Sequence, residues 1–63
     1  MQDWFFSWIF VDEENEVTAQ GWDIRRENLS ASAVDVARTY IEEISIKYEV
    51  PAGRIILMAM NKL

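Results

Sequence analysis

The sequence predicts an α+β fold in which a three-stranded antiparallel sheet carries one helix on one of its faces, in the order ββαβ. Three observations predict it: an apolar run near the amino terminus, a second near the carboxyl terminus, and one amphipathic segment between them. The 63 residues make a single domain, residues 1–63, near the lower limit for folding without disulfides or a metal. The first strand is the most apolar, so we expect it in the centre, in strand order 2-1-3 with a right-handed crossover.

The first strand, expected over residues 4–11, is apolar on both of its faces. Side chains of a strand alternate with a period of two, so this segment presents two different rows. The chain offers one helix, which can cover only one of them. The aromatic row is Trp4, Phe6, Trp8 and Phe10, and the smaller row is Phe5, Ser7, Ile9 and Val11.

A polar turn at residues 12–16 joins this strand to a second strand expected over residues 17–24. The length of the turn is ordinary for a β-hairpin. We expect Val11 to pair with Val17, a register that places Trp22 on the same face as the aromatic row.

The helix is expected to begin after an N-cap at Ser30 or Ser32 and to end near Tyr48. Pro51 disfavours helical geometry at the residue before it, and we expect Gly53 to adopt a positive φ in the connection to the last strand. Apolar residues at spacings of three and four predict the side that faces the sheet. They are Val34, Ala37, Tyr40, Ile41, Ile44 and Tyr48.

The last strand is expected over residues 54–63 and is also apolar on both faces. Helices approach a sheet closely where side chains are small, so we expect the helix to cover the smaller row together with Ile55, Leu57 and Ala59. The aromatic row then lies open as a partner or dimer interface. This candidate interface consists of Trp4, Phe6, Trp8, Phe10, Trp22, Ile56, Met58 and Met60.

An alternative arrangement buries the aromatic row under the helix. It leaves an apolar set uncovered on the other side of the sheet, namely Ile9, Val11, Val17, Ile55 and Leu57. An apolar face therefore stays open in both arrangements, and exposed patches of this kind mark interfaces.

The chain carries eleven acidic and six basic residues, a formal net charge of −5. This charge repels phosphate backbones and anionic membranes, so neither nucleic acid nor a membrane is the expected partner. The acidic residues of the hairpin turn either are solvated or meet a basic partner. They are Asp12, Glu13, Glu14 and Glu16.

The composition argues against catalysis. Histidine and cysteine are absent, and the two glycines do not form a phosphate-binding loop. We therefore expect no enzyme activity, no cofactor and no metal site. Without a targeting or membrane-spanning pattern, we expect a cytoplasmic protein.

Single-stranded nucleic acid remains an alternative partner, because an aromatic sheet can stack bases. Trp4, Trp8 and Trp22 would form that platform. The basic groove it requires would come from Arg25, Arg26, Arg54 and Lys62.

The ββαβ order, the length and the turn Val50-Pro51-Ala52-Gly53 resemble the small T7-type phage inhibitors of bacterial RNA polymerase. Trp4-Phe5 near the start of the first strand and Tyr48 before the turn are also similar. In that family, basic residues of the last strand contact the polymerase, whereas the matching positions here are Met58 and Met60. The resemblance implies a small acidic phage protein that works by occupying the surface of a host protein.

Taken together, the residues and the resemblance predict a cytoplasmic protein-binding module without catalysis. Its expected role is that of a phage-encoded inhibitor of a host protein, either RNA polymerase or a defence or nucleic-acid enzyme. The alternative is a self-associating domain that forms a homodimer through its aromatic sheet face.

Overall fold

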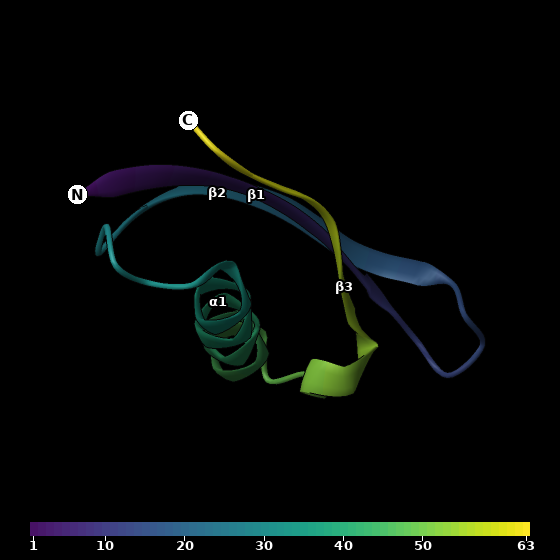
Figure 1. The fold of residues 1–63 in the computed structure, drawn as a ribbon. Helices are drawn as coiled ribbons and strands as arrows, with labels where there is room; N and C mark the ends of the chain where they lie inside the picture. Colours follow the sequence, from purple (N-terminus) through teal and green to yellow (C-terminus); the bar gives the residue numbers. More distant parts are fainter.

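The computed structural model describes residues 1–63 and has the predicted ββαβ order, with a short 3₁₀ helix before the last strand. Its elements are β1 (Gln2–Val11), β2 (Val17–Glu27), α1 (Ala33–Tyr48), η1 (Ala52–Arg54) and β3 (Ile55–Lys62). The strand order β2-β1-β3, antiparallel at both contacts, confirms the predicted fold class. In Figure 1 α1 lies against one side of a curved sheet, and no element covers the other side. No helix of the structure is both long and apolar enough to cross a membrane.

The hairpin turn between β1 and β2 is organised by one side chain. Asp12 Oδ1 accepts hydrogen bonds from the backbone N–H groups of Glu14 at 2.8 Å and Glu16 at 2.9 Å. Asn15 takes a positive φ of 62°, which asparagine tolerates better than most residues. Arg54 Nη1 donates to the Asp12 carbonyl at 2.6 Å, so the start of β3 is tied to this turn.

The β1–β2 register contains a bulge just beyond the turn. Val11 pairs with Val17, as the sequence predicts, but Phe10 pairs with Ala19. Thr18 is therefore an extra residue on β2, and no residue of β1 pairs with it. Such a bulge shifts every following residue of the strand by one position.

This shift moves the rest of β2 to the opposite face from the one expected. Phe6 pairs with Asp23 and Trp8 with Gly21, so the expected placement of Trp22 beside the aromatic row is wrong. A slip of one residue exchanges the two faces of a strand, because side chains alternate with a period of two. Trp22 consequently points away from the helix.

A second bulge interrupts the pairing of β1 with β3. Ser7 pairs with Ala59, while the next residue, Trp8, pairs with Leu57. Met58 is the extra residue, and the side chains of β3 exchange faces at this point.

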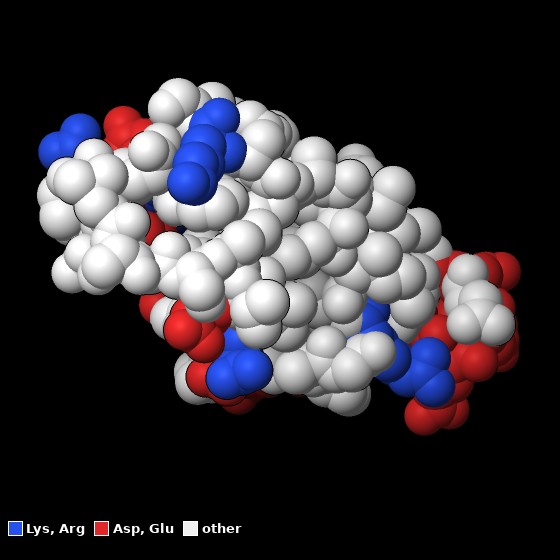
Figure 2. Space-filling view, in the orientation of Figure 1, with Lys and Arg blue, Asp and Glu red and all other residues white.

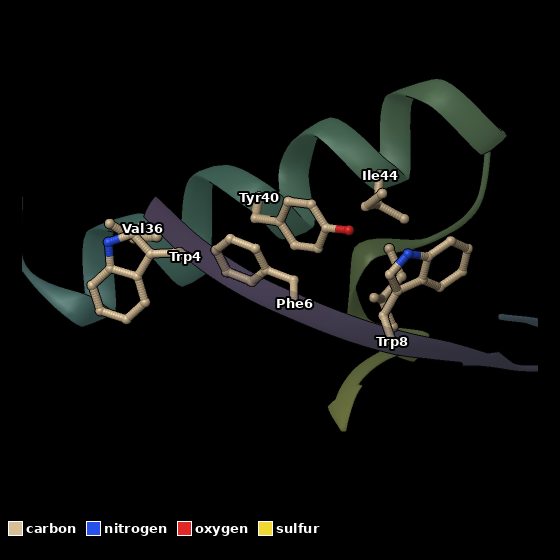
Figure 3. Packing of buried hydrophobic residues seen from close by; sticks show 7 residues of the cluster. Trp4, Phe6, Trp8, Val36, Tyr40 and Ile44 are labelled. Carbon is tan, nitrogen blue, oxygen red and sulfur yellow. The ribbon is translucent and has the colours of Figure 1, made fainter. Parts of the chain in front are cut away.

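The core lies between α1 and the aromatic row of β1. Phe6 is fully buried, and its ring stacks on that of Tyr40 with centroids 4.1 Å apart. Figure 3 shows Trp4, Phe6 and Trp8 all pointing from β1 towards the helix. The seven buried residues are Trp4, Phe6, Trp8, Val36, Tyr40, Ile44 and Ile55.

The expectation that the helix covers the smaller row is therefore wrong. That expectation assumed that a helix packs closely where the sheet carries small side chains. The covered face does carry small side chains, but they come from β2. The bulge places Ala19 and Gly21 on the covered face, beside Phe10 and Trp8. A Cβ atom at Gly21 would lie 2.9 Å from Trp8 Cζ2, so the absence of a side chain makes room for the indole.

Helix α1 begins at the predicted N-cap. Ser32 Oγ accepts a hydrogen bond from the Asp35 backbone N–H at 3.1 Å, which satisfies one of the free donors of the first turn. The helix ends at Glu49, which is left-handed with a φ of 55°. The expectation of a positive φ at Gly53 is wrong, because no glycine of the chain has one.

The buried side of α1 is rotated from the predicted stripe. Val36, Tyr40 and Ile44 are buried, whereas Val34 is 65% exposed and Tyr48 is 46% exposed. Val36, and not Val34, therefore faces the sheet. Ile44 and Tyr40 were expected on the covered side, and the structure confirms this placement.

Candidate protein-binding surface

The side of the sheet that α1 leaves uncovered, called the open face below, is apolar along its middle. Trp22 is 66% exposed there, Met58 62%, Ile24 55% and Ile56 44%. Figure 2 shows uncharged atoms over the middle of the molecule and acidic atoms gathered at the hairpin end. The middle of the open face includes Phe5, Ser7, Ile9, Gln20, Trp22, Ile24, Ile56, Met58 and Ala59.

Trp22 is the largest side chain on the open face, and it is stacked on a neighbouring ring. The rings of Trp22 and Phe5 have centroids 6.3 Å apart and planes inclined by 25°. Stacked aromatic pairs at this separation contribute favourable energy beyond their buried area.

A shallow hollow lies beside Trp22, over the middle of β1. Ser7 pairs with Trp22 on one side and with Ala59 on the other, so two small residues lie in the same row as the Trp22 ring. Ile9 and Met58 also line the hollow. The open face thus offers both a protruding aromatic ring and a recess, the two features that pair across interfaces.

Charge on the open face is confined to one end and is balanced there. Arg26 Nε donates to Asp3 Oδ1 at 3.0 Å, and both side chains lie in the row of the open face. The hydrogen bond from Arg26 lowers the pKa of Asp3, and the same contact raises the pKa of Arg26. Both groups therefore stay charged at neutral pH and cancel each other.

The structure does not assemble the eight residues of the expected interface into one surface. Trp4, Phe6 and Trp8 are buried under α1, so the assignment of their row to the open side is wrong. Phe10 and Met60 are partly buried and pack against that core. The two bulges explain why these residues are divided between the two faces. The bulge in β3 places Met60 on the covered face, and the bulge in β2 places Trp22 on the open face.

Three of the eight residues do lie on the open face. They are Trp22, Ile56 and Met58, each of them exposed. The alternative arrangement, with the aromatic row under the helix, is the one that the structure adopts. Of the residues that it leaves uncovered, Ile9 lies on the open face, whereas Ile55 is buried.

A polar network covers the edge of the core on β2. Tyr40 Oη donates a hydrogen bond to Asp23 Oδ2, and Arg25 lies over the Tyr40 ring at 5.7 Å from its centroid. Arg25 Nη2 also donates to Glu43 Oε1 at 3.0 Å. Burial, and then the hydrogen bond to Asp23, raise the pKa of Tyr40. The hydrogen bond to Glu43 raises the pKa of Arg25.

This network was not predicted from the sequence, although a signal for it exists. Asp23 and Arg25 alternate with Trp22 and Ile24, so β2 has one polar row and one apolar row. Only the bulge decides that the polar row joins the helix. The network joins β2 to α1 along one side of the core.

The tryptophan platform for single-stranded nucleic acid is not assembled. Trp22 is exposed, whereas Trp4 and Trp8 are buried on the opposite side of the sheet. Arg25 and Arg26, two of the four basic residues assigned to the groove, are engaged with acidic side chains. Stacking by one ring without a basic groove provides little affinity for a polyanion.

The acidic hairpin turn lies at the end of the molecule, away from the hollow. Its residues 12–16 are polar, and those from Glu13 to Glu16 are exposed. Asp12 is partly exposed and holds the turn together, so its carboxylate has a structural role. The turn borders the open face but does not contribute to it.

Comparison of this chain with protein-family models, with curated proteins and with solved structures finds no match.

Proposed function

We propose that this chain is a small acidic protein-binding module that acts by covering a protein surface, without catalysis, and that the open face is its interface. One observation carries the proposal: a sheet face with four large apolar side chains at least 44% exposed has no covering element in its own chain. Contiguous apolar patches of this kind are uncommon on monomers unless a partner covers them.

The composition of the open face supports the proposal. Tryptophan, phenylalanine and methionine are enriched at the centres of interfaces, and Trp22, Phe5 and Met58 lie together here. Their neighbours Ser7 and Gln20 supply hydrogen-bonding groups at the same place. We therefore assign the role of anchor to Trp22.

The resemblance to phage inhibitors of RNA polymerase suggests a biological role for such a module, the inhibition of a host protein. The contacts would differ from those of that family, because Met58 is exposed on the open face and Met60 packs against the core. A target bound through this surface would present an apolar patch rather than an acidic one. Host RNA polymerase and defence or nucleic-acid enzymes are the targets to test.

Site-specific photo-crosslinking tests the proposal. A benzoylphenylalanine residue in place of Trp22 should form adducts with a protein when the full chain is illuminated in a bacterial lysate. The matched control carries the same residue in place of Ile46, which is 78% exposed on α1, on the far side of the molecule. Adducts at position 22 and not at position 46 support the proposal, and equal yields at the two positions contradict it.

A transcription assay tests the inhibitory role. The chain should reduce the activity of purified bacterial RNA polymerase if that enzyme is the target, and Trp22→Ser should relieve the inhibition. Ile46→Ser, a change of an equally exposed apolar residue, should leave it intact. Unchanged transcription at a large excess of the chain removes the polymerase from the set of targets.

A further inference from the structure

We propose that the occupant of the open face is a second copy of this chain, packed face to face about a two-fold axis that passes near Ser7. This inference rests on the proposed function, because it names the partner for the same surface. Three properties of the molecule support it: the distribution of charge, the dimensions of the face and the small size of the core.

The charge distribution permits two copies to meet only on a few surfaces. Each copy carries a net charge of −5, which opposes association over most of its exterior. In the rows of the open face from Asp3 to Ile9, the only charged side chains are Asp3 and Arg26, which are paired. This part of the face therefore brings no unbalanced charged side chains together, and a strongly basic partner would find no unpaired acidic side chain here to select it.

The dimensions of the open face match what a dimer of this size needs. The Cα trace of the whole molecule measures 38 × 17 × 17 Å, so its long face has a footprint of at most about 650 Å², at the lower end of the roughly 600–1,000 Å² that each partner contributes to a standard interface. An identical slab laid along this face covers its full length.

The small core favours a partner that is always present to cover the open face. Only seven of the 63 residues are buried, and all of them lie on one side of the sheet. Chains of this length often rely on association to reach adequate stability. A second copy is available wherever the chain is made, and any partner that binds only the folded state stabilises it.

Sedimentation and tryptophan quenching of the full chain, over a range of concentrations, test the inference together. Trp22 is 66% exposed, whereas Trp4 is 4% and Trp8 is 2% exposed, so acrylamide reports almost entirely on Trp22. We expect the mass to double with concentration and the quenching to fall in parallel. A mass that stays at one chain throughout overturns the inference. A dimer in which Trp22 remains quenchable, such as one joined through the outer edge of β3, also overturns it.

Charged substitutions locate the interface. Ile24→Lys places two like charges in the dimer seam and should weaken self-association at least 100-fold. Ile46→Lys, which makes the same change on α1, should alter it less than twofold. Met58→Lys provides a second variant on the open face, and circular dichroism verifies that each variant is folded. Equal effects at positions 24 and 46 overturn the inference.

The photo-crosslinking at position 22 distinguishes failure of this inference from failure of the proposed function. Adducts with twice the mass of the chain support both. Adducts with only another protein retain the binding module and overturn the homodimer. Adducts of neither kind overturn both.

Discussion

The two faces of the sheet are similar in apolar content and opposite in environment. The covered face carries Trp4, Phe6 and Trp8, each at most 4% exposed, and the open face carries Trp22 at 66%. Adjacent residues of one strand, such as Phe5 and Phe6, thus belong to different surfaces. The difference teaches that apolar character alone does not identify a core: what decides is which row the single helix covers.

The largest expected effect comes from the matched pair Phe6 and Phe5. Phe6→Ala should lower the free energy of unfolding by about 3–5 kcal/mol, since it leaves a cavity against Tyr40, and this loss rivals the whole stability of a small domain at about 5 kcal/mol. Phe5→Ala should cost less, about 1–2 kcal/mol, because its ring is only partly buried and stacks on the exposed Trp22. Urea unfolding followed by circular dichroism measures both. Comparable losses would show that the two faces are not as different as the burial implies.

Gly21 sharpens the comparison, because the covered face lacks room for a methyl group at this position. Gly21→Ala should destabilise the fold by about 1–3 kcal/mol, since its Cβ would meet the Trp8 indole. Gly53→Ala is the matched control, with no atom within 4 Å of its Cβ and no positive φ, and it should stabilise the fold by about 0.4–1 kcal/mol. Thermal unfolding of the two variants measures the contrast. A tolerated alanine at position 21 would contradict the packing of Trp8.

The Tyr40 network predicts a loss of stability at alkaline pH. Burial and the hydrogen bond to Asp23 raise the pKa of Tyr40 in the folded state, so the proton is held more tightly there than in the unfolded chain. The stabilisation is complete below the unfolded pKa of about 10 and declines above it by about 1.4 kcal/mol per pH unit. Urea midpoints between pH 8 and pH 11 measure this slope. Tyr40→Phe should flatten it, and an unchanged slope in that variant would assign the effect to other groups.

The smallest expected effect on folding belongs to the open face. At concentrations where the chain is monomeric, Trp22→Ser should cost no more than about 1 kcal/mol, mainly the stack on Phe5. Trp8→Ser, a change of the same residue type on the covered face, should cost more than about 4 kcal/mol. Chemical denaturation at low concentration compares the two. A Trp22 variant that unfolds would make this residue part of the core rather than an anchor for a partner.

Much of the fold could be predicted from the sequence, because it depends on local patterns. Four features follow from the alternation of side chains, from capping and from the length of the connections. They are the hairpin, the Ser32 cap, the helix between Ala33 and Tyr48 and the strand order 2-1-3. The presence of an open apolar face also follows, since one helix cannot cover both rows of β1.

The membership of that face could not be predicted in the same way. Thr18 and Met58 are extra residues in their strands, and nothing local distinguishes them from residues in an unbroken ladder. Each shifts the register by one, and a shift of one exchanges the faces. For this reason Trp22 is found on the open side and Met60 against the core.

By itself, the sequence determined that this chain forms one ββαβ sheet with more apolar surface than its helix can cover. Only the tertiary structure decided which surface is covered. Trp4, Phe6 and Trp8 fill the space under α1 because Gly21 and Ala19 are brought beside them, and this depends on the Thr18 bulge. Local patterns specify the helix and the strands, whereas the pairing of distant residues specifies which face of the sheet each side chain joins. The candidate interface depends on that pairing.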